Sequence, residues 1–217
     1  MKGSNLKQLN QALCSLLLFV SAFSIAQSSD KGMSLPTGIE RWGSIPIGSE
    51  KTVFVIPDGF PMTASWDSKR PEMYQAGFFP EGQSREAWKD SLRLMAFGIP
   101  KGDEAPAKKM LGIVASQIKS ICPNDFFLEN KEQTDSLRAA AILGCRKLGG
   151  DPTKSIAGYF LAIQGKETVF VFAREKRQDT AIVDTPVSKD IQSKWQAETD
   201  RAVICGRNEP CIGKPNR

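Results

Sequence analysis

The sequence predicts an α+β fold, disulfide-stapled, in which two principal helices pack on a mostly antiparallel sheet. Two runs rich in β-branched and aromatic residues, 156–163 and 168–173, flank a short polar turn, as in a β-hairpin. Over residues 104–121 apolar side chains instead recur every three or four positions, which indicates an amphipathic helix. Four cysteines in the second half of the chain are enough for two disulfides.

The N-terminal segment 1–26 has the layout of a secretory signal peptide. Two lysines precede an uncharged, largely apolar run that ends in small residues. That run of about 14 residues is shorter than the roughly 20 that a membrane-spanning helix needs. We therefore predict cleavage between Ala26 and Gln27. An uncleaved anchor and a lipoprotein attached through Cys14 are the alternatives.

The remaining chain is predicted to be one domain, 41–217, preceded by a flexible mature N-terminus, 27–40. Loss of the two lysines of the signal lowers the formal charge from +5 to +3. Charges of both signs are interspersed, so no basic face for nucleic acid is predicted. No second apolar stretch reaches membrane-spanning length, and the mature protein is expected to be soluble.

The mature cysteines are predicted to form two disulfides. They are Cys122, Cys145, Cys205 and Cys211. Three connectivities are possible, of which the sequence-local one pairs the first with the second and the third with the fourth. The alternative is a four-cysteine zinc site, but the spacings lack the short Cys-x₂₋₄-Cys unit typical of such sites.

The first strands are predicted upstream of residue 100. Structure is expected to begin near Trp42, and residues 51–56 form a β-branched run closed by a turn. The stretch 61–71 holds no clear element. Two further strands are predicted over 72–79 and 88–97.

The first helix, 104–121, has recognisable ends. Asp103 is the predicted N-cap, and Pro106 lies in the first turn, where a missing N–H costs little. Pro123 is expected to stop the helix.

The C-terminal part is predicted to add strands and one helix. Residues 134–148 fit either a strand or a helix, and we favour a strand because the hairpin of 156–163 and 168–173 needs a sheet to join. A second helix is predicted over 186–202, with Thr185 as N-cap and a proline at its first position.

The absence of histidine excludes Ser-His-Asp or Cys-His catalysis and histidine-ligated zinc or haem within this chain. Ser116 and Lys119 match a Ser-x-x-Lys pattern, but late in a helix and without companion motifs. Residues 149–155 faintly resemble a phosphate-binding loop in which Thr153 replaces the required glycine. We therefore predict no catalytic, metal-binding or cofactor-binding residue.

Carboxylates suitable for a glycosidase are present, but no spacing singles out a pair. They are Glu72, Glu81, Glu86, Asp90 and Glu129. Three tryptophans could form a sugar-binding platform, although in small domains such residues more often fill the core or its rim. They are Trp42, Trp66 and Trp88.

Short motifs are scattered between residues 78 and 177. They are Phe79-Pro80-Glu81-Gly82, Trp88, Cys122-Pro123, Cys145, Ala162-Ile163-Gln164-Gly165, Val169-Phe170-Val171 and Ala173-Arg174. In these motifs about half the chain resembles a loose group of small exported proteins of Gram-negative bacteria with a PsbP-like α/β/α sandwich. The resemblance implies an antiparallel sheet with helices packed on it, and a Cys122–Cys145 bridge from the first helix to a strand. It implies no catalytic residue and does not extend to 27–77 or to the last two cysteines.

The sequence thus favours a non-enzymatic binding or accessory protein, periplasmic or secreted, acting on a protein or envelope component through a sheet face or edge. The alternative is a carboxylate-dependent hydrolase of an envelope polymer. The two differ structurally. An enzyme needs acids that converge in a desolvated pocket, whereas a binding module exposes an apolar patch or an open strand edge. The sequence specifies neither a ligand nor an oligomeric state.

Overall fold

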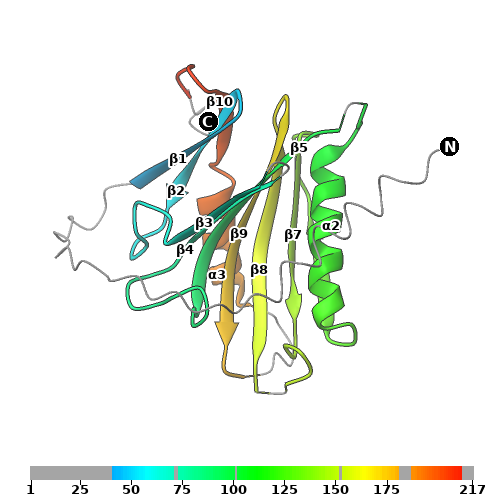
Figure 1. Ribbon diagram of the computed structural model, residues 1–217. Coiled ribbons are helices and arrows are strands. Elements are labelled where there is room, and N and C mark those ends of the chain that lie inside the picture. Colours follow the sequence, from blue (N-terminus) through cyan, green and yellow to red (C-terminus); the bar gives the residue numbers. More distant parts are fainter. Residues whose placement is uncertain (1–40, 71–72, 101, 152, 181–186, 212–217) are drawn as a thin grey trace. The chain divides into compact units, whose positions relative to one another are not determined.

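The computed structural model describes residues 41–70, 73–100, 102–151, 153–180 and 187–211, which belong to one compact unit of the chain. It confirms the α+β class: two helices pack on a mostly antiparallel sheet (Figure 1). The strands are β1 (Arg41–Ile47), β2 (Glu50–Ile56), β3 (Trp66–Arg70), β4 (Met73–Phe78), β5 (Asp90–Gly98), β6 (Phe126–Lys131), β7 (Arg138–Cys145), β8 (Ser155–Gln164), β9 (Thr168–Gln178) and β10 (Val203–Gly206), and the helices are α2 (Pro106–Ile121) and α3 (Lys189–Thr199).

The larger sheet has seven strands in the order β3-β4-β5-β9-β8-β7-β6, and every neighbouring pair is antiparallel. Its central hairpin, β8–β9, is the one that the sequence predicts. Side chains of a strand alternate between the two faces of the sheet. Both faces are covered here, so Leu161 and Phe172 lie in one apolar cluster while Ala162 and Val171 lie in the other. This double burial explains the nearly continuous apolar sequence of β8 and β9.

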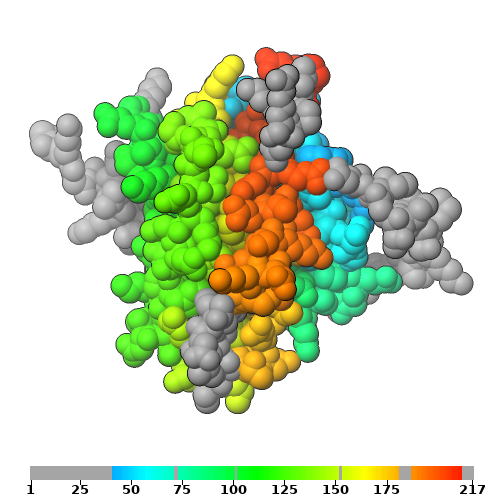
Figure 2. Space-filling model, turned by 180° about the vertical axis from the view of Figure 1, so that it is seen from behind, coloured from blue at the N-terminus to red at the C-terminus, as the bar shows by residue number. Residues whose placement is uncertain are grey.

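One face of the large sheet is covered by α3 and by the small sheet β1-β2-β10 (Figure 2). Phe54 of β2 packs its ring against Phe78 and Phe172, at centroid distances of 5.7 and 5.6 Å. Trp195 of α3 is buried in the same cluster. The buried Tyr159 hydroxyl donates a hydrogen bond to Asp200 at the end of α3, and burial raises the pKa of this tyrosine, which keeps it neutral.

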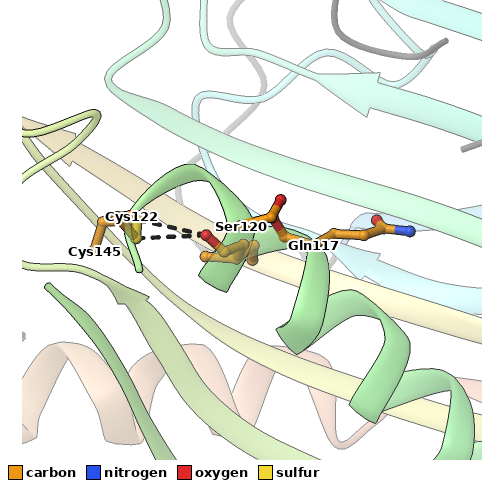
Figure 3. The surroundings of a disulfide bond; sticks show 5 residues. Gln117, Ser120, Cys122 and Cys145 are labelled. Atoms are coloured by element: carbon orange, nitrogen blue, oxygen red, sulfur yellow. Dashed lines mark hydrogen bonds between the residues drawn. A yellow bond between two sulfur atoms is a disulfide. The ribbon is translucent and has the colours of Figure 1, made fainter. Parts of the chain in front are cut away.

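The opposite face is covered by α2, which packs mainly on β7, β8 and β9. Leu111, Val114 and Ala115 are its buried residues at the centre of this contact. A disulfide between Cys122 and Cys145 ties the C-terminal end of α2 to the end of β7, with 5.9 Å between the Cα atoms (Figure 3). The two sulfur atoms lie 3.4 and 4.0 Å from the Ile118 carbonyl oxygen, but as disulfide sulfurs they have no hydrogen to donate.

The second disulfide, Cys205–Cys211, closes a short loop after β10, with 5.5 Å between the Cα atoms. The structure therefore contains the sequence-local pairing of the four cysteines.

Four strands were not predicted from the sequence: β1, β3, β6 and β10. Each lies at an edge of its sheet. Edge strands are exposed along one side and need less apolar sequence than central strands, so their sequence signal is weak.

Both predicted N-caps are wrong. Helix α2 begins at Pro106, its N-cap is Ala105, and the Asp103 carboxylate instead accepts bonds from the Ala105 N–H and from Lys109. Helix α3 begins at Lys189 with Ser188 as its N-cap. The predicted cap Thr185 and the proline after it lie outside the described residues.

A buried carboxylate links the two sheets. Glu50 at the start of β2 is 4% exposed, and its oxygens accept hydrogen bonds from the backbone N–H groups of Lys166 and Glu167, at 2.7 and 3.1 Å. These two residues form the turn between β8 and β9 together with Gly165. A Cβ atom at Gly165 would overlap the Glu50 carboxylate, so the turn needs glycine there.

We expect Glu50→Ala to destabilise the protein by about 2 kcal/mol or more, because two N–H groups lose a charged acceptor. Gly165→Ala should destabilise it similarly in the wild type and less in the Glu50→Ala background, where the overlap is gone. Urea unfolding followed by tryptophan fluorescence measures both changes. Glu167→Ala is the control, since the exposed Glu167 carboxylate accepts a hydrogen bond from the Ser49 hydroxyl and no other among the described residues. Equal losses for Glu50→Ala and Glu167→Ala would contradict the assigned role.

Candidate functional site

The carboxylates considered from the sequence do not converge. Glu81 and Glu86 are exposed in the loop between β4 and β5, and Glu129 is exposed on β6, at the far edge of the sheet. Asp90, at the start of β5, is only half-buried. Glu72 lies outside the described residues, as do the predicted cleavage residues Ala26 and Gln27. The described part of the chain thus gives the hydrolase alternative no pair of acids among those considered.

The three tryptophans do not form one exposed platform. Trp42 on β1 is 41% exposed, whereas Trp88 is 6% exposed and stacks on Phe79. The guanidinium group of an arginine also lies over each ring. Arg201 lies 4.9 Å from the centre of Trp42, Arg85 lies 4.1 Å from that of Trp66, and Arg177 lies 4.1 Å from that of Trp88. These rings act as packing surfaces for arginine.

The two motif matches have structural explanations. The Ser116 hydroxyl donates to the carbonyl of Gly112 one turn earlier in α2, and Lys119 is exposed. In the connection between β7 and β8, Gly149 and Gly150 have positive φ, and the Asp151 carboxylate accepts the N–H of Thr153. Within the ranges that the structure describes, no three metal-ligating side chains cluster, and no helix is long and apolar enough to cross a bilayer.

A groove of about 420 Å³ lies between α2 and the edge strand β6. It exists because α2 packs mainly on β7, β8 and β9 and contacts β6 less, so that the α2-side face of β6 is left mostly uncovered. Its apolar and neutral lining consists of Leu111, Gly112 and Ala115 from α2, Leu128 and Asn130 from β6, Ala139 and Ala140 from β7, and Gln133. We call this feature the α2–β6 groove.

Two residues keep the α2–β6 groove open. Leu128 remains 45% exposed although it lines the groove. Gly112 faces open space, since a Cβ atom placed there would have no neighbour within 4 Å. The groove volume lies within the range of about 300–1,000 Å³ that ligand sites occupy.

The charged lining of the groove is entirely cationic: Lys108, Lys131 and Arg138. The Arg138 guanidinium group donates hydrogen bonds to the backbone carbonyls of Asp200 and Ala202, just after α3. Lys131 contacts Glu129 and Gln192. Among the described residues, Lys108 has no ion-pair partner. Lys131 and Arg138 are ion-paired with Glu129 and Asp135, so the groove combines apolar walls with one lysine, Lys108, whose charge has no ion-pair partner among the described residues.

The backbone of β6 borders this groove and points partly outward. Arg146 N–H donates to the Asp125 carbonyl at 2.8 Å, which starts the ladder between β6 and β7. Hydrogen-bonded pairs alternate along an antiparallel ladder. The odd-numbered residues of β6 therefore direct their N–H and C=O groups to β7, and the even-numbered ones, Leu128 and Asn130 among them, direct theirs outward. The side chains of these even-numbered residues also face the groove.

The other sheet edges, β3, β1 and the four-residue strand β10, are short, charged or contain proline. The opposite edge of the large sheet is β3, which has five residues including Asp67, Lys69 and Arg70. The edge strand β1 of the small sheet contains Pro46, which has no N–H to offer. Short, charged or proline-containing edges resist pairing with another strand. Strand β6 is the edge that combines outward backbone groups with an adjacent groove.

No protein-family model and no curated protein matches the chain. Among solved structures, a mutant of the protein Mog1 is similar at a TM-score of 0.43 and 10% identity, over 74% of this chain and 85% of that one. The Saccharomyces cerevisiae Ran-binding protein Mog1p is similar at a TM-score of 0.39 and 10% identity, over 68% and 78%. We draw no conclusion about function from similarities at this level.

Proposed function

We propose that this protein is a non-enzymatic, exported binding protein of the bacterial envelope that captures an extended segment of a partner protein. The segment adds to the edge of β6 as a further strand and places side chains in the α2–β6 groove. The observation that carries this proposal is the outward-pointing backbone of Leu128 and Asn130 directly beside that groove.

Strand addition accounts for both features together. Backbone hydrogen bonds to a sheet edge supply affinity in such complexes, and pockets for alternate side chains supply specificity. Here the outward N–H and C=O groups would bind the backbone of the segment. The groove would receive the side chains on the same face as Leu128.

Export is proposed from the N-terminal sequence, and the two disulfides fit an oxidising compartment. N-terminal sequencing of the protein purified from its source should begin at Gln27. A purified protein that retains Met1 would contradict cleavage.

The proposal predicts that Asn130→Pro lowers partner binding by about tenfold or more. Proline removes an outward N–H, and the partner carbonyl left unpaired costs about 1–3 kcal/mol. The ladder to β7 does not use this N–H, so Tm should change little. Mature protein on a solid support is exposed to envelope extract, and the retained proteins are quantified by mass spectrometry.

Matched variants make this experiment decisive. Asn130→Ala keeps the N–H and should retain the partner, whereas Glu129→Pro removes an inward N–H and should lower Tm. Gly112→Trp fills the groove and should lose the partner, while Gly112→Ala should retain it and leave the helix at least as stable. A retained set that is the same for wild type, Asn130→Pro and Gly112→Trp would overturn the proposal.

A further inference from the structure

We propose, on the basis of the function proposed above, that the captured segment carries an acidic residue followed by two large apolar residues at alternate positions: acid-x-apolar-x-apolar. The chemistry of the α2–β6 groove and the direction of β6 specify this order.

The apolar positions follow from the alternation of side chains. A residue paired with Leu128 across the new ladder would have its side chain on the groove face, with its Cβ about 5 Å from that of Leu128. The next residue on that face lies two positions along the segment, near Phe126. Leu111 and Ala115 form the apolar wall of the groove, and the exposed part of Leu128 lies beside them. Phe126 is partly buried against the apolar cluster that α2 covers. Large apolar side chains would cover this surface.

The direction of the segment follows from the sheet. All pairs of neighbouring strands in the large sheet are antiparallel, and antiparallel pairing is slightly the more stable kind. A segment antiparallel to β6 begins near Asn130, at the C-terminal end of β6, and ends near Phe126. Its first groove-facing residue therefore lies beside Asn130.

The charge at that end is positive. Lys131 is the last residue of β6, and Lys108 lies in the first turn of α2, whose N-terminal end also carries the positive pole of the helix. Both lysines line the groove, and no carboxylate does. The Lys131 ammonium is paired with Glu129 and reaches Gln192 of α3, so Lys108 supplies the charge that has no ion-pair partner among the described residues. An acidic side chain fits this end, and a basic one would be repelled. At the other end the Cys122–Cys145 disulfide holds α2 close to the sheet.

Fluorescently labelled heptapeptides with blocked termini test this order. The probe Thr-Glu-Thr-Leu-Thr-Phe-Thr is compared with versions that carry Gln or Lys in place of Glu, and with the reversed sequence. Binding to the mature protein is measured by fluorescence anisotropy at low ionic strength. The Glu peptide should bind about two- to fivefold more tightly than the Gln peptide, as expected for an exposed ion pair. The reversed peptide should bind more weakly than either.

Charge exchange assigns the effect to the groove. Lys108→Glu should reverse the preference, so that the Lys peptide binds more tightly than the Glu peptide. Lys109→Glu is the matched control, because Lys109 pairs with Asp103 and does not line the groove. It should leave the preference for the Glu peptide unchanged.

The outcomes separate the two proposals. Equal binding of the Glu, Gln and Lys peptides, or tighter binding of the reversed peptide, overturns the acidic motif or its direction. If the peptides bind the wild type in either of these ways and Asn130→Pro still abolishes their binding, strand addition at β6 stands. If no peptide binds the wild type at millimolar concentration, the motif is wrong, and the retention pattern of the Asn130 and Gly112 variants then decides strand addition separately.

Discussion

Glu175→Ala is expected to destabilise the protein by about 3 kcal/mol, the largest effect that we predict for a single substitution. Glu175 lies on β9 with a fully buried side chain, and Arg93 of β5 binds both its oxygens through Nε and Nη2. The Ser91 hydroxyl donates to the same carboxylate at 3.3 Å. Loss of the carboxylate leaves a guanidinium group without its anion, which typically costs 3–5 kcal/mol in a buried pair. We take the lower value because the Arg93 side chain is 36% exposed and can be partly rehydrated.

Thermal unfolding followed by circular dichroism measures this loss as a drop in Tm of roughly 6–12 °C. Glu175→Met combined with Arg93→Met should recover much of it, since two apolar side chains of similar length leave no unpaired charge. Asp179→Ala breaks the exposed ion pair with Lys89 and should leave Tm almost unchanged. A double variant less stable than Glu175→Ala would show that the charge pair itself stabilises the sheet.

Gly158 explains how a glutamate fits at this position. It pairs with Glu175 across β8 and β9, and a Cβ atom there would lie 2.7 Å from the Glu175 Cγ. The glycine therefore provides the space for a charged side chain inside the sheet.

The second large effect concerns the disulfide at the end of α2. Replacement of Cys122 and Cys145 by alanine should destabilise the protein by about 3.5 kcal/mol, because the unfolded chain regains the freedom of a long loop. Removal of the shorter Cys205–Cys211 loop should cost about 2 kcal/mol by the same reasoning. Urea unfolding of the two double variants, with disulfides verified by intact mass, measures both.

The two disulfides should also differ in their effect on binding. Without the Cys122–Cys145 bridge, α2 is no longer held to β7 at one end of the groove, and the affinity for the Glu peptide should fall. The variant without Cys205–Cys211 should bind as the wild type does, because that loop lies on the small sheet. A greater loss of stability or affinity in the latter variant would contradict this assignment.

The sequence predicted the elements whose burial is regular. The strands of hairpin β8–β9 are buried on both faces and therefore almost continuously apolar, and helix α2 has an apolar stripe at three- and four-residue spacing. Both elements are where the sequence predicts them. The ambiguous stretch 134–148 does contain a strand, β7. Its Ala139 and Ala141 belong to the cluster that α2 covers, whereas Ala140 belongs to the cluster on the opposite face.

The missed strands lack such periodicity for identifiable reasons. In β1 a glycine is needed because a Cβ atom at Gly43 would lie 2.9 Å from Phe54 and Ile56. Pro46 also interrupts the strand pattern, and β1 is an edge strand, where proline is tolerated. In β3 the solvent-exposed edge is charged. The sequence of β6, Phe-Phe-Leu-Glu-Asn-Lys, begins apolar and ends polar, so neither period is visible.

The candidate site could not have been predicted from the sequence, because its edge strand lacks a periodic apolar pattern. It consists of an unrecognised edge strand and a helix whose apolar face is wider than the surface it covers. The sequence does contain one indication of the site, Gly112. A glycine inside a helix lowers the stability of the helix by about 1 kcal/mol relative to alanine. The structure places that glycine against open space at the groove.

The order of strands in the large sheet also has a consequence for how the chain folds. Strands β3 to β5 form one meander and β6 to β9 another, each built from neighbours in sequence, and they meet only where β5 pairs with β9. Pairing β5 with β9 brings together residues about 80 positions apart, which costs more chain entropy than forming any hairpin in either meander. We infer that the pairing of β5 with β9 is the slow step of sheet assembly. Arg93 lies on β5 and Glu175 on β9, so their ion pair would join the two meanders late, after β6 and its open edge have formed.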